Sequence, residues 1–226
     1  MNISPRYDLL FNYTLLDVVF AVLGFVWVMV VVQLISKKFY EWLVARGESH
    51  RVAVYYNRKL IHILAGGLVA LLVPVLFSGP FVPLILALVL VVMTYLPHRT
   101  GRLMEWFQVE WNIYETHFCI MWGIILYAMW ILFGNPWYGV VPIAFMAFGD
   151  AVTGITRNYM FRHRTKSWWG NFAMALFCVP FGYLIFGVAG AIAGLIASVV
   201  EHFEYGKLDD NITVPLSSAL ILLVFA

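Results

Sequence analysis

The sequence predicts an all-α integral membrane protein, a bundle of about seven or eight transmembrane helices. Of its 226 residues, 63% are hydrophobic and 12% are charged, and the mean hydropathy is +0.87. Soluble domains carry about 25% charged residues, so the composition excludes an ordinary soluble fold. Apolar runs near the length that spans a bilayer recur along the whole chain. We expect residues 1–226 to form a single membrane domain.

A spanning helix needs about 20 mainly apolar residues, or somewhat fewer in a tight bundle. Eight segments approach this length: 15–36, 60–77, 81–96, 118–133, 137–156, 171–186, 188–203 and 212–226. The breaks at 78–80, at 134–136 and around Gly187 carry no charge, whereas the other connections are basic. Residues 97–117 mix charges with aromatic side chains, a pattern typical of an interfacial helix with an aromatic belt.

This topology places all but one of the 14 Lys and Arg residues on one side of the membrane and leaves Arg6 on the other. The positive-inside rule makes the basic side cytoplasmic, with both termini outside. The membrane is then a plasma membrane or the endoplasmic reticulum. A net charge of +2 gives no indication of a nucleic-acid partner, and we expect none. The sequence leaves the oligomeric state open.

Two further features bear on processing and redox chemistry. The first apolar run, near Leu15, has no cleavage signal before it, so we expect it to be a retained helix. Cys119 and Cys178 lack the spacing of a disulfide or a metal site.

Asp150 interrupts the long uncharged run that contains the stretch MAFGDAVTGI. A charged side chain in hydrocarbon costs roughly 2.5–3.5 kcal/mol on insertion scales. Gly149, Ala151 and Gly154 surround Asp150 with small side chains, and Gly154 shares its helix face. A close helix contact would explain the glycines. A Mg²⁺ site near the cytoplasmic surface would also explain the acid.

Basic residues stand at the entrances of two predicted helices. Arg58, Lys59 and His62 have i,i+3 and i,i+4 spacing, so all three project from the start of the second helix. Lys166 and Ser167 precede Gly170 at the expected start of the sixth helix, where free N–H groups, a hydroxyl and an ammonium suit a phosphate. Arg58 and Lys59 are equally compatible with ordinary positive-inside residues.

A second polar group precedes the last helix. In one interpretation Asn211 is the N-cap, and the neighbouring acids Asp209 and Asp210 favour the helix dipole. In the other, Asp210 and Asn211 form a cation site together with Asp150. Glu201 and His202 are compatible with the same pocket or with an ordinary helix end. The serine-hydrolase and zinc-protease motifs are missing from the sequence.

Taken in order, these segments resemble the motifs of the polyprenol kinase family, which includes dolichol kinase, phytol kinase and CTP-dependent diacylglycerol kinase. Residues 58–62 (RKLIH) are similar to its RKxxH motif, and residues 149–154 (GDAVTG) to its GDxxA/G segment. Residues 166–173 (KSWWGNFA) are similar to KSxxGSxA, and Glu201 with residues 210–215 (DNITVP) completes the pattern. Asn171 stands where the family usually has Ser, and the linker after Arg157 lacks the usual glycines.

The resemblance implies a kinase that transfers the γ-phosphate of CTP, with Mg²⁺, to a membrane lipid alcohol such as a polyprenol, dolichol, phytol or geranylgeraniol. It implies that Asp150 and Asp210 hold the metal with support from Asn211, and that His62 orients phosphate or accepts a proton. Asp150, His62 and Asp210 are then the catalytic residues. The nucleotide would be held by the remaining motif residues: Arg58, Lys59, Gly149, Gly154, Lys166, Ser167 and Gly170.

Two other functions use similar groups. A CTP:lipid cytidylyltransferase would attack the α-phosphate, but the segment after Asp150 lacks the KR and KD pairs usual in such enzymes. A small ion-coupled transporter would use Asp150 and His62 as coupling groups. Such transporters typically show inverted repeats with broken helices at the midplane, and the sequence has no such repeat.

Overall fold

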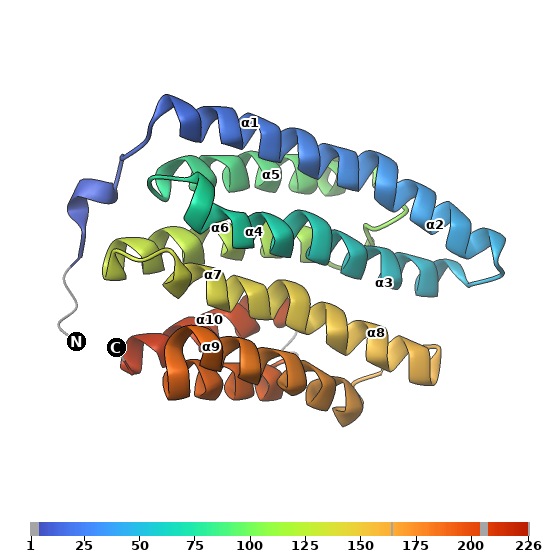
Figure 1. Cartoon of the computed structure of the whole chain (residues 1–226). Coiled ribbons are helices and arrows are strands. Elements are labelled where there is room, and N and C mark those ends of the chain that lie inside the picture. Colours follow the sequence, from blue (N-terminus) through green and yellow to red (C-terminus); the bar gives the residue numbers. More distant parts are fainter. Residues whose placement is uncertain (1–4, 164, 204–207, 226) are drawn as a thin grey trace.

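The computed structural model describes residues 5–163, 165–203 and 208–225, and these form a helical bundle (Figure 1). The described residues contain no β-strand, only an isolated bridge between Val109 and Asn112. Six of their helices are long and apolar enough to cross a membrane. The predicted all-α membrane fold is therefore confirmed, and the protein is a multi-pass membrane protein.

The elements follow one another with short connections. A single-turn 3-10 helix, η1 (Tyr7–Leu9), precedes a long helical rod made of α1 (Leu15–Val30), the π-helical turn η2 (Val31–Ile35) and α2 (Ser36–Ala45). A second rod consists of α3 (His50–Ile61), the π-turn η3 (His62–Gly67) and α4 (Leu68–Leu76). The rest are α5 (Phe81–Thr100), α6 (Tyr114–Phe133), α7 (Trp137–Ala144), the π-turn η4 (Phe145–Gly149), α8 (Asp150–Phe161), α9 (Trp168–Val200) and α10 (Asp210–Val224).

The rod formed by α7, η4 and α8 runs through the interior of the bundle, between α3–α4 on one side and α9–α10 on the other (Figure 1). Of the 18 most apolar consecutive residues in this rod, 78% are buried inside the protein, whereas the share is 11% for the α1–α2 rod. Phe145, Met146 and Ala147 of η4 are fully buried. This interior position explains how the fold keeps Asp150 away from lipid.

Helix α9 folds back on itself at Phe186 and Gly187. Gly187 has φ 57° and ψ −138°, a conformation that only glycine adopts readily. The two halves then pack together, because Gly182 and Gly190 approach each other closely, as do Gly194 and the backbone of Cys178. The predicted break at Gly187 is correct. The predicted segments 171–186 and 188–203 are therefore the two halves of this helical hairpin. Among the described residues, the six long apolar helices, with α9 counted once, and the shorter α10 agree with the predicted seven or eight.

Two expectations require correction. Several helices extend beyond the apolar segments, because hydropathy marks the span in lipid and not the hydrogen-bonded helix: α3 begins at His50, and α8 continues to Phe161. The predicted interfacial helix at 97–117 is wrong, because Gly101 at φ 68° ends α5 and the chain stays irregular until α6. The Trp106 indole donates to the Val32 carbonyl at 3.0 Å and ties this loop to η2. Arg164 and Lys207, counted on the basic side, lie outside the described residues.

Candidate active site

Two π-helical turns meet beside Asp150. The turn η3 begins at His62, and η4 ends at Gly149, directly before Asp150. Such turns add a residue to one helical turn and are frequent at functional sites. A Cβ atom on Gly67 would overlap the Phe148 ring, so the two turns pack closely. The backbones that carry His62 and Asp150 are thereby held close together.

The negative charge of Asp150 is compensated by two side chains of the α3–η3 segment. Lys59 Nζ lies 2.6 Å from both carboxylate oxygens, and His62 Nδ1 lies 3.0 Å from Oδ2. All three side chains are about 5% exposed or less. A Cβ atom on Gly154 would overlap the Lys59 side chain. Gly154 therefore provides the space through which Lys59 reaches Asp150.

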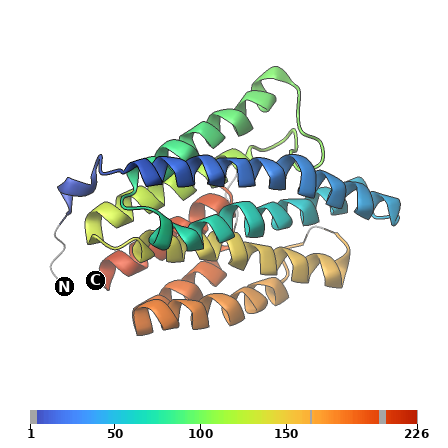
Figure 2. The ribbon, with the colours of Figure 1, turned by 45° about the horizontal axis from the view of Figure 1, so that its top comes forward.

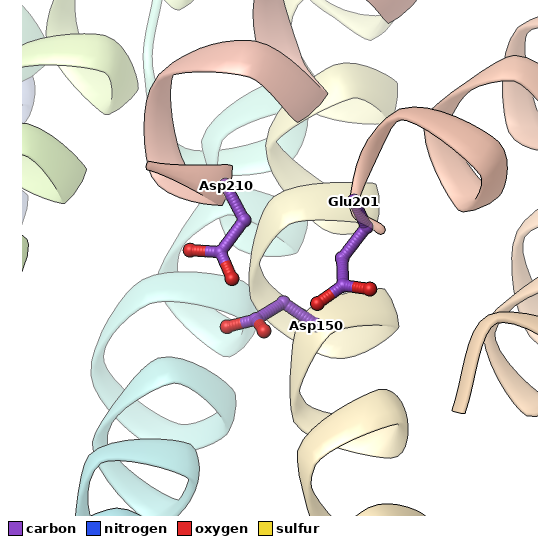
Figure 3. A group of neighbouring side chains, drawn as sticks. All are labelled: Asp150, Glu201 and Asp210. Carbon is purple, nitrogen blue, oxygen red and sulfur yellow. The ribbon is translucent and has the colours of Figure 1, made fainter. Parts of the chain in front are cut away.

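Three carboxylates converge at this point (Figure 3). Asp150 begins α8, Glu201 follows the last residue of α9, and Asp210 begins α10. Each contributes an oxygen, and these oxygens lie within 4.8 Å of one another. Oxygen ligands at this separation suit a divalent cation such as Mg²⁺, which usually takes one or two protein carboxylates. Asp150 and Asp210, predicted as a pair, are brought together, and Glu201 joins them.

Arg157 holds Glu201 in this acid cluster. Its Nη1 and Nη2 atoms donate to the two oxygens of Glu201, each at 2.8 Å, and Nη2 also donates to the Asn171 side-chain oxygen at 2.8 Å. A Cβ atom on Gly170 would overlap the Arg157 side chain. Sequence reasoning missed Arg157 as a site residue, although it lies on the same helix face as Asp150. It also treated Asn171 only as a departure from the family motif.

A polar cavity of about 1080 Å³ adjoins the cluster, and Glu201 and Asp210 are among its lining residues. It is bordered by α3, the 101–111 segment, the end of α8 and the segment that begins α9. Its basic lining residues are Arg51, Arg58, Lys59, Arg157, Arg162 and Lys166, and its acidic ones are Glu105, Glu110, Glu201 and Asp210. The excess of basic groups favours an anionic ligand. Arg51 and Arg162 were not predicted as site residues.

Two curated proteins are similar to the chain. A phytol kinase of Synechocystis sp. is 28% identical over 182 residues, which cover 73% of this chain and 77% of that protein. Phytol kinase 1, chloroplastic, of Arabidopsis thaliana is 28% identical over 201 residues, which cover 73% of this chain and 64% of that protein. These matches support assignment to the polyprenol kinase family. No family description matches the chain, and no solved structure is significantly similar.

Of the polyprenol kinase motif residues, Lys166 is the basic group nearest to Asp210. Its Nζ atom lies 3.8 Å from Asp210 Oδ2, and it donates to Glu201 Oε1 at 3.2 Å. Ser167 is the N-cap of α9 and accepts from the Trp169 amide, so its hydroxyl serves the helix end. Its carbonyl accepts from Arg157 Nε at 3.0 Å. The KSWWGN segment thus supports the acid cluster from the start of α9.

Arg58 does not join Lys59 and His62. Its guanidinium lies over the Tyr114 ring, 4.0 Å from the centroid, at the wall of the polar cavity. His62 instead faces Asp150 and stacks on Phe118. The predicted common face of the three basic residues is therefore split between two surroundings.

The N-cap interpretation of Asn211 is wrong. Asp209 is the N-cap of α10, and its carboxylate accepts a hydrogen bond from the backbone N–H of Asn211 at 3.1 Å. Asp209 also contacts His117 Nδ1 at 2.8 Å. The Asn211 side chain is fully buried, and neither of its polar atoms has a hydrogen-bond partner. Asp209 is thus a structural acid beside Asp210.

His202 lies beside the cluster rather than in it. Its ring stacks on Trp168 with centroids 3.9 Å apart, and Nδ1 lies 3.2 Å from the Asn171 side-chain oxygen. Burial and the nearby Arg157 guanidinium lower the pKa of His202 below its usual value. The imidazole is therefore neutral at pH 7 and packs as an aromatic ring.

Proposed function

We propose that this protein is a lipid alcohol kinase that transfers the γ-phosphoryl group of CTP to a prenol-type alcohol in the membrane. One observation carries the proposal: three carboxylates and three cations, Lys59, Arg157 and Lys166, converge beside a large cavity with an excess of basic groups, and two of the acids, Glu201 and Asp210, line it. The two relatives named phytol kinase support an alcohol acceptor. CTP as the donor rests on the motif resemblance.

The cavity suits the triphosphate. Phosphoryl transfer depends mainly on positioning the phosphates and neutralising their charge. Arg51, Arg58 and Arg162 line the cavity around the more deeply buried Lys59 and Arg157. Guanidinium groups bind phosphate oxygens with two hydrogen bonds at once. These residues would hold the nucleotide with its γ-phosphate directed at the acid cluster.

The donor set at the cluster fits Mg²⁺. Asp150, Glu201 and Asp210 offer carboxylate oxygens within 4.8 Å of one another, and cations balance their charge. When bound, the metal would neutralise phosphate charge during transfer. Lys59 donates to both oxygens of Asp150 in the ligand-free protein, so it would release at least one of them to the metal.

The chain's own groups would handle the alcohol. Its oxygen would attack the γ-phosphorus, the bond to the β-phosphate oxygen would break, and the nucleoside diphosphate would leave. The hydroxyl proton would pass to His62, which Asp150 orients through Nδ1. A lipid alcohol stays in the bilayer and CTP in the cytosol, so we propose that the cavity faces the cytoplasm.

The deciding experiment uses purified protein, Mg²⁺ and a panel of lipid alcohols and lipid phosphates. Parallel reactions receive CTP labelled at the γ- or the α-phosphate, and the lipid extract is counted. Label entering lipid only from the γ-position is the expected result. Label only from the α-position would make the protein a cytidylyltransferase. No label from either position would overturn both enzyme assignments and return Asp150 to a transport or structural role.

A further inference from the structure

A second cavity, of about 110 Å³, lies among α1, η2, η3, α5 and α6. We call it the apolar groove; its walls include Gln33, His62, Ala65, Leu90, Glu115 and Phe118. Most of its lining is hydrocarbon, in helices that are apolar enough to cross a membrane. In Figure 2, α5 diverges from α1 toward its C-terminal end. The lining residues of the groove come from both helices, among them Met29 of α1 and Leu90 of α5.

The apolar groove reaches the acid cluster through one side chain. His62 lines the groove, stacks on Phe118 with ring centroids 4.4 Å apart, and contacts Asp150 through Nδ1. Asp150 in turn belongs to the acid cluster, whose other members, Glu201 and Asp210, line the polar cavity. A molecule in the groove that touches His62 is therefore one side chain away from Asp150.

Two polar groups of the groove wall lack partners. Among the described residues, His62 has Asp150 as its one hydrogen-bond partner, so Nε2 has none. Glu115 Oε1 accepts from Gln108 at 2.6 Å and lies 2.5 Å from His98 Nε2, whereas Oε2 is buried without a partner. Buried polar atoms in native proteins are normally hydrogen-bonded, so Glu115 Oε2 requires an explanation, and His62 Nε2 is available as an acceptor or donor. A ligand with a hydroxyl donor supplies that explanation.

We propose that the apolar groove binds the hydroxyl-bearing end of a single-chain isoprenoid alcohol, with the hydroxyl at His62. This inference rests on the proposed function, because the alcohol is the acceptor of that reaction. A volume of about 110 Å³ admits only the first carbons of the chain, and the rest lies in the bilayer. The groove therefore distinguishes the first isoprene unit and not the chain length.

The dimensions of the groove also select against glycerides. A diacylglycerol carries a second acyl chain next to its hydroxyl, and a cavity of this volume does not hold both chains beside His62. The two substrates of the reaction would thus approach from different sides. The nucleotide enters the polar cavity, the alcohol enters the apolar groove, and they meet at the contact between His62 and Asp150.

The test is photolabelling of the wild-type protein in lipid nanodiscs without nucleotide. The probe is a geranylgeraniol analogue with a diazirine on its first isoprene unit. We expect labelled peptides from η3, α5 and α6, with competition by excess geranylgeraniol but not by dioleoylglycerol. Labelling confined to other exposed apolar side chains, such as Leu184 and Val188 of α9, would overturn the proposal. Equal competition by the two lipids would also overturn it.

Two pairs of variants test the groove, and each pair combines a substitution in its wall with a control at an exposed position. Ala65→Phe and Leu90→Trp fill it, whereas Val75→Phe and Leu88→Trp introduce the same aromatic side chains at exposed positions of α4 and α5. The groove variants should reduce labelling and raise the KM for the alcohol by about tenfold or more, with the KM for CTP unchanged. The exposed variants should behave like the wild type. Equal effects at groove and exposed positions would contradict the assignment.

Photolabelling tests the binding site and the phosphoryl-transfer assay tests the kinase, so a negative result in one does not imply a negative result in the other. Labelling in the groove without phosphate transfer would retain the binding site and overturn the kinase. Phosphate transfer without labelling in the groove would retain the kinase and overturn the site. A binding readout on the wild-type chain also keeps the test decisive if a bulky variant fails to fold.

Discussion

Arg157 and Glu201 form a buried ion pair in which two guanidinium nitrogens each donate to a different carboxylate oxygen at 2.8 Å. Their side chains are 2% and 1% exposed. The pair joins α8 to the end of the α9 hairpin, and Glu201 also faces Asp150 and Asp210. One contact therefore links the packing of two helices to the geometry of the acid cluster.

Arg157→Gln should destabilise the protein strongly. Removing one partner of a buried ion pair typically costs about 3–5 kcal/mol, because the remaining charge loses its compensation. For a chain of this size the Tm should fall by about 6 °C or more. Arg162→Gln is the matched control, because Arg162 pairs with Glu48 at the surface with a side chain 63% exposed. Exposed pairs contribute about 1 kcal/mol or less. Similar Tm shifts for both variants would contradict the buried pair.

Asp150→Asn should reduce phosphoryl transfer by about 100-fold or more, the usual cost of losing an electrostatic group at a reacting centre. Its control is Asp17→Asn, since Asp17 is also a buried acid of a membrane helix. Asp17 closes a capping box with Thr14 and accepts from the Ser78 amide, away from the cluster. That variant should lose stability but keep its activity per folded molecule. A D150N protein with full activity at limiting Mg²⁺ would contradict the metal assignment.

Gly154→Ala should impair activity more than stability. The added Cβ would overlap the Lys59 side chain and displace the ammonium from Asp150. Overpacking of this kind costs about 1–3 kcal/mol. In the control Gly24→Ala, the new Cβ meets only Leu86 Cδ2, at 3.9 Å, so the change should be neutral or slightly stabilising. Measuring kcat and Tm for both variants tests this, and unchanged kcat in G154A would refute the role of the Lys59 contact.

Asp210→Asn should raise the Mg²⁺ concentration for half-maximal activity by about tenfold or more, because the metal loses a charged ligand. Asp209→Asn should leave that concentration unchanged and lower the Tm modestly, since Asn still caps α10 but the carboxylate contact with His117 is lost. Chelation of Mg²⁺ should abolish activity in all forms. A metal titration of the two neighbouring variants distinguishes the site acid from the structural acid. A larger shift in D209N would reverse their roles.

Much of the fold follows from local sequence properties. Hydropathy predicted the membrane helices, and an uncharged break predicted the turn at Gly187. The basic motif residues Arg58, Lys59 and Lys166 meet at one end of the bundle, as their placement in the topology predicted. Hydropathy did not predict the ends of helices that extend beyond the apolar region. Helical hydrogen bonding continues through Arg51 and Arg157 although both are charged.

The sequence by itself determined that this is a helical membrane protein whose polar motifs gather at one end. It did so because burial in lipid and the length of a spanning helix depend on residues close together in the chain. Only the tertiary structure decided that Lys59 and not Arg58 pairs with Asp150, that Arg157 holds Glu201, and that His62 joins the acid cluster to the apolar groove. Those choices depend on how each helix is rotated and how closely it packs. In this protein, close glycine contacts and two π-turns set the rotation and the packing distance of the helices. Charge and hydropathy do not predict these two features.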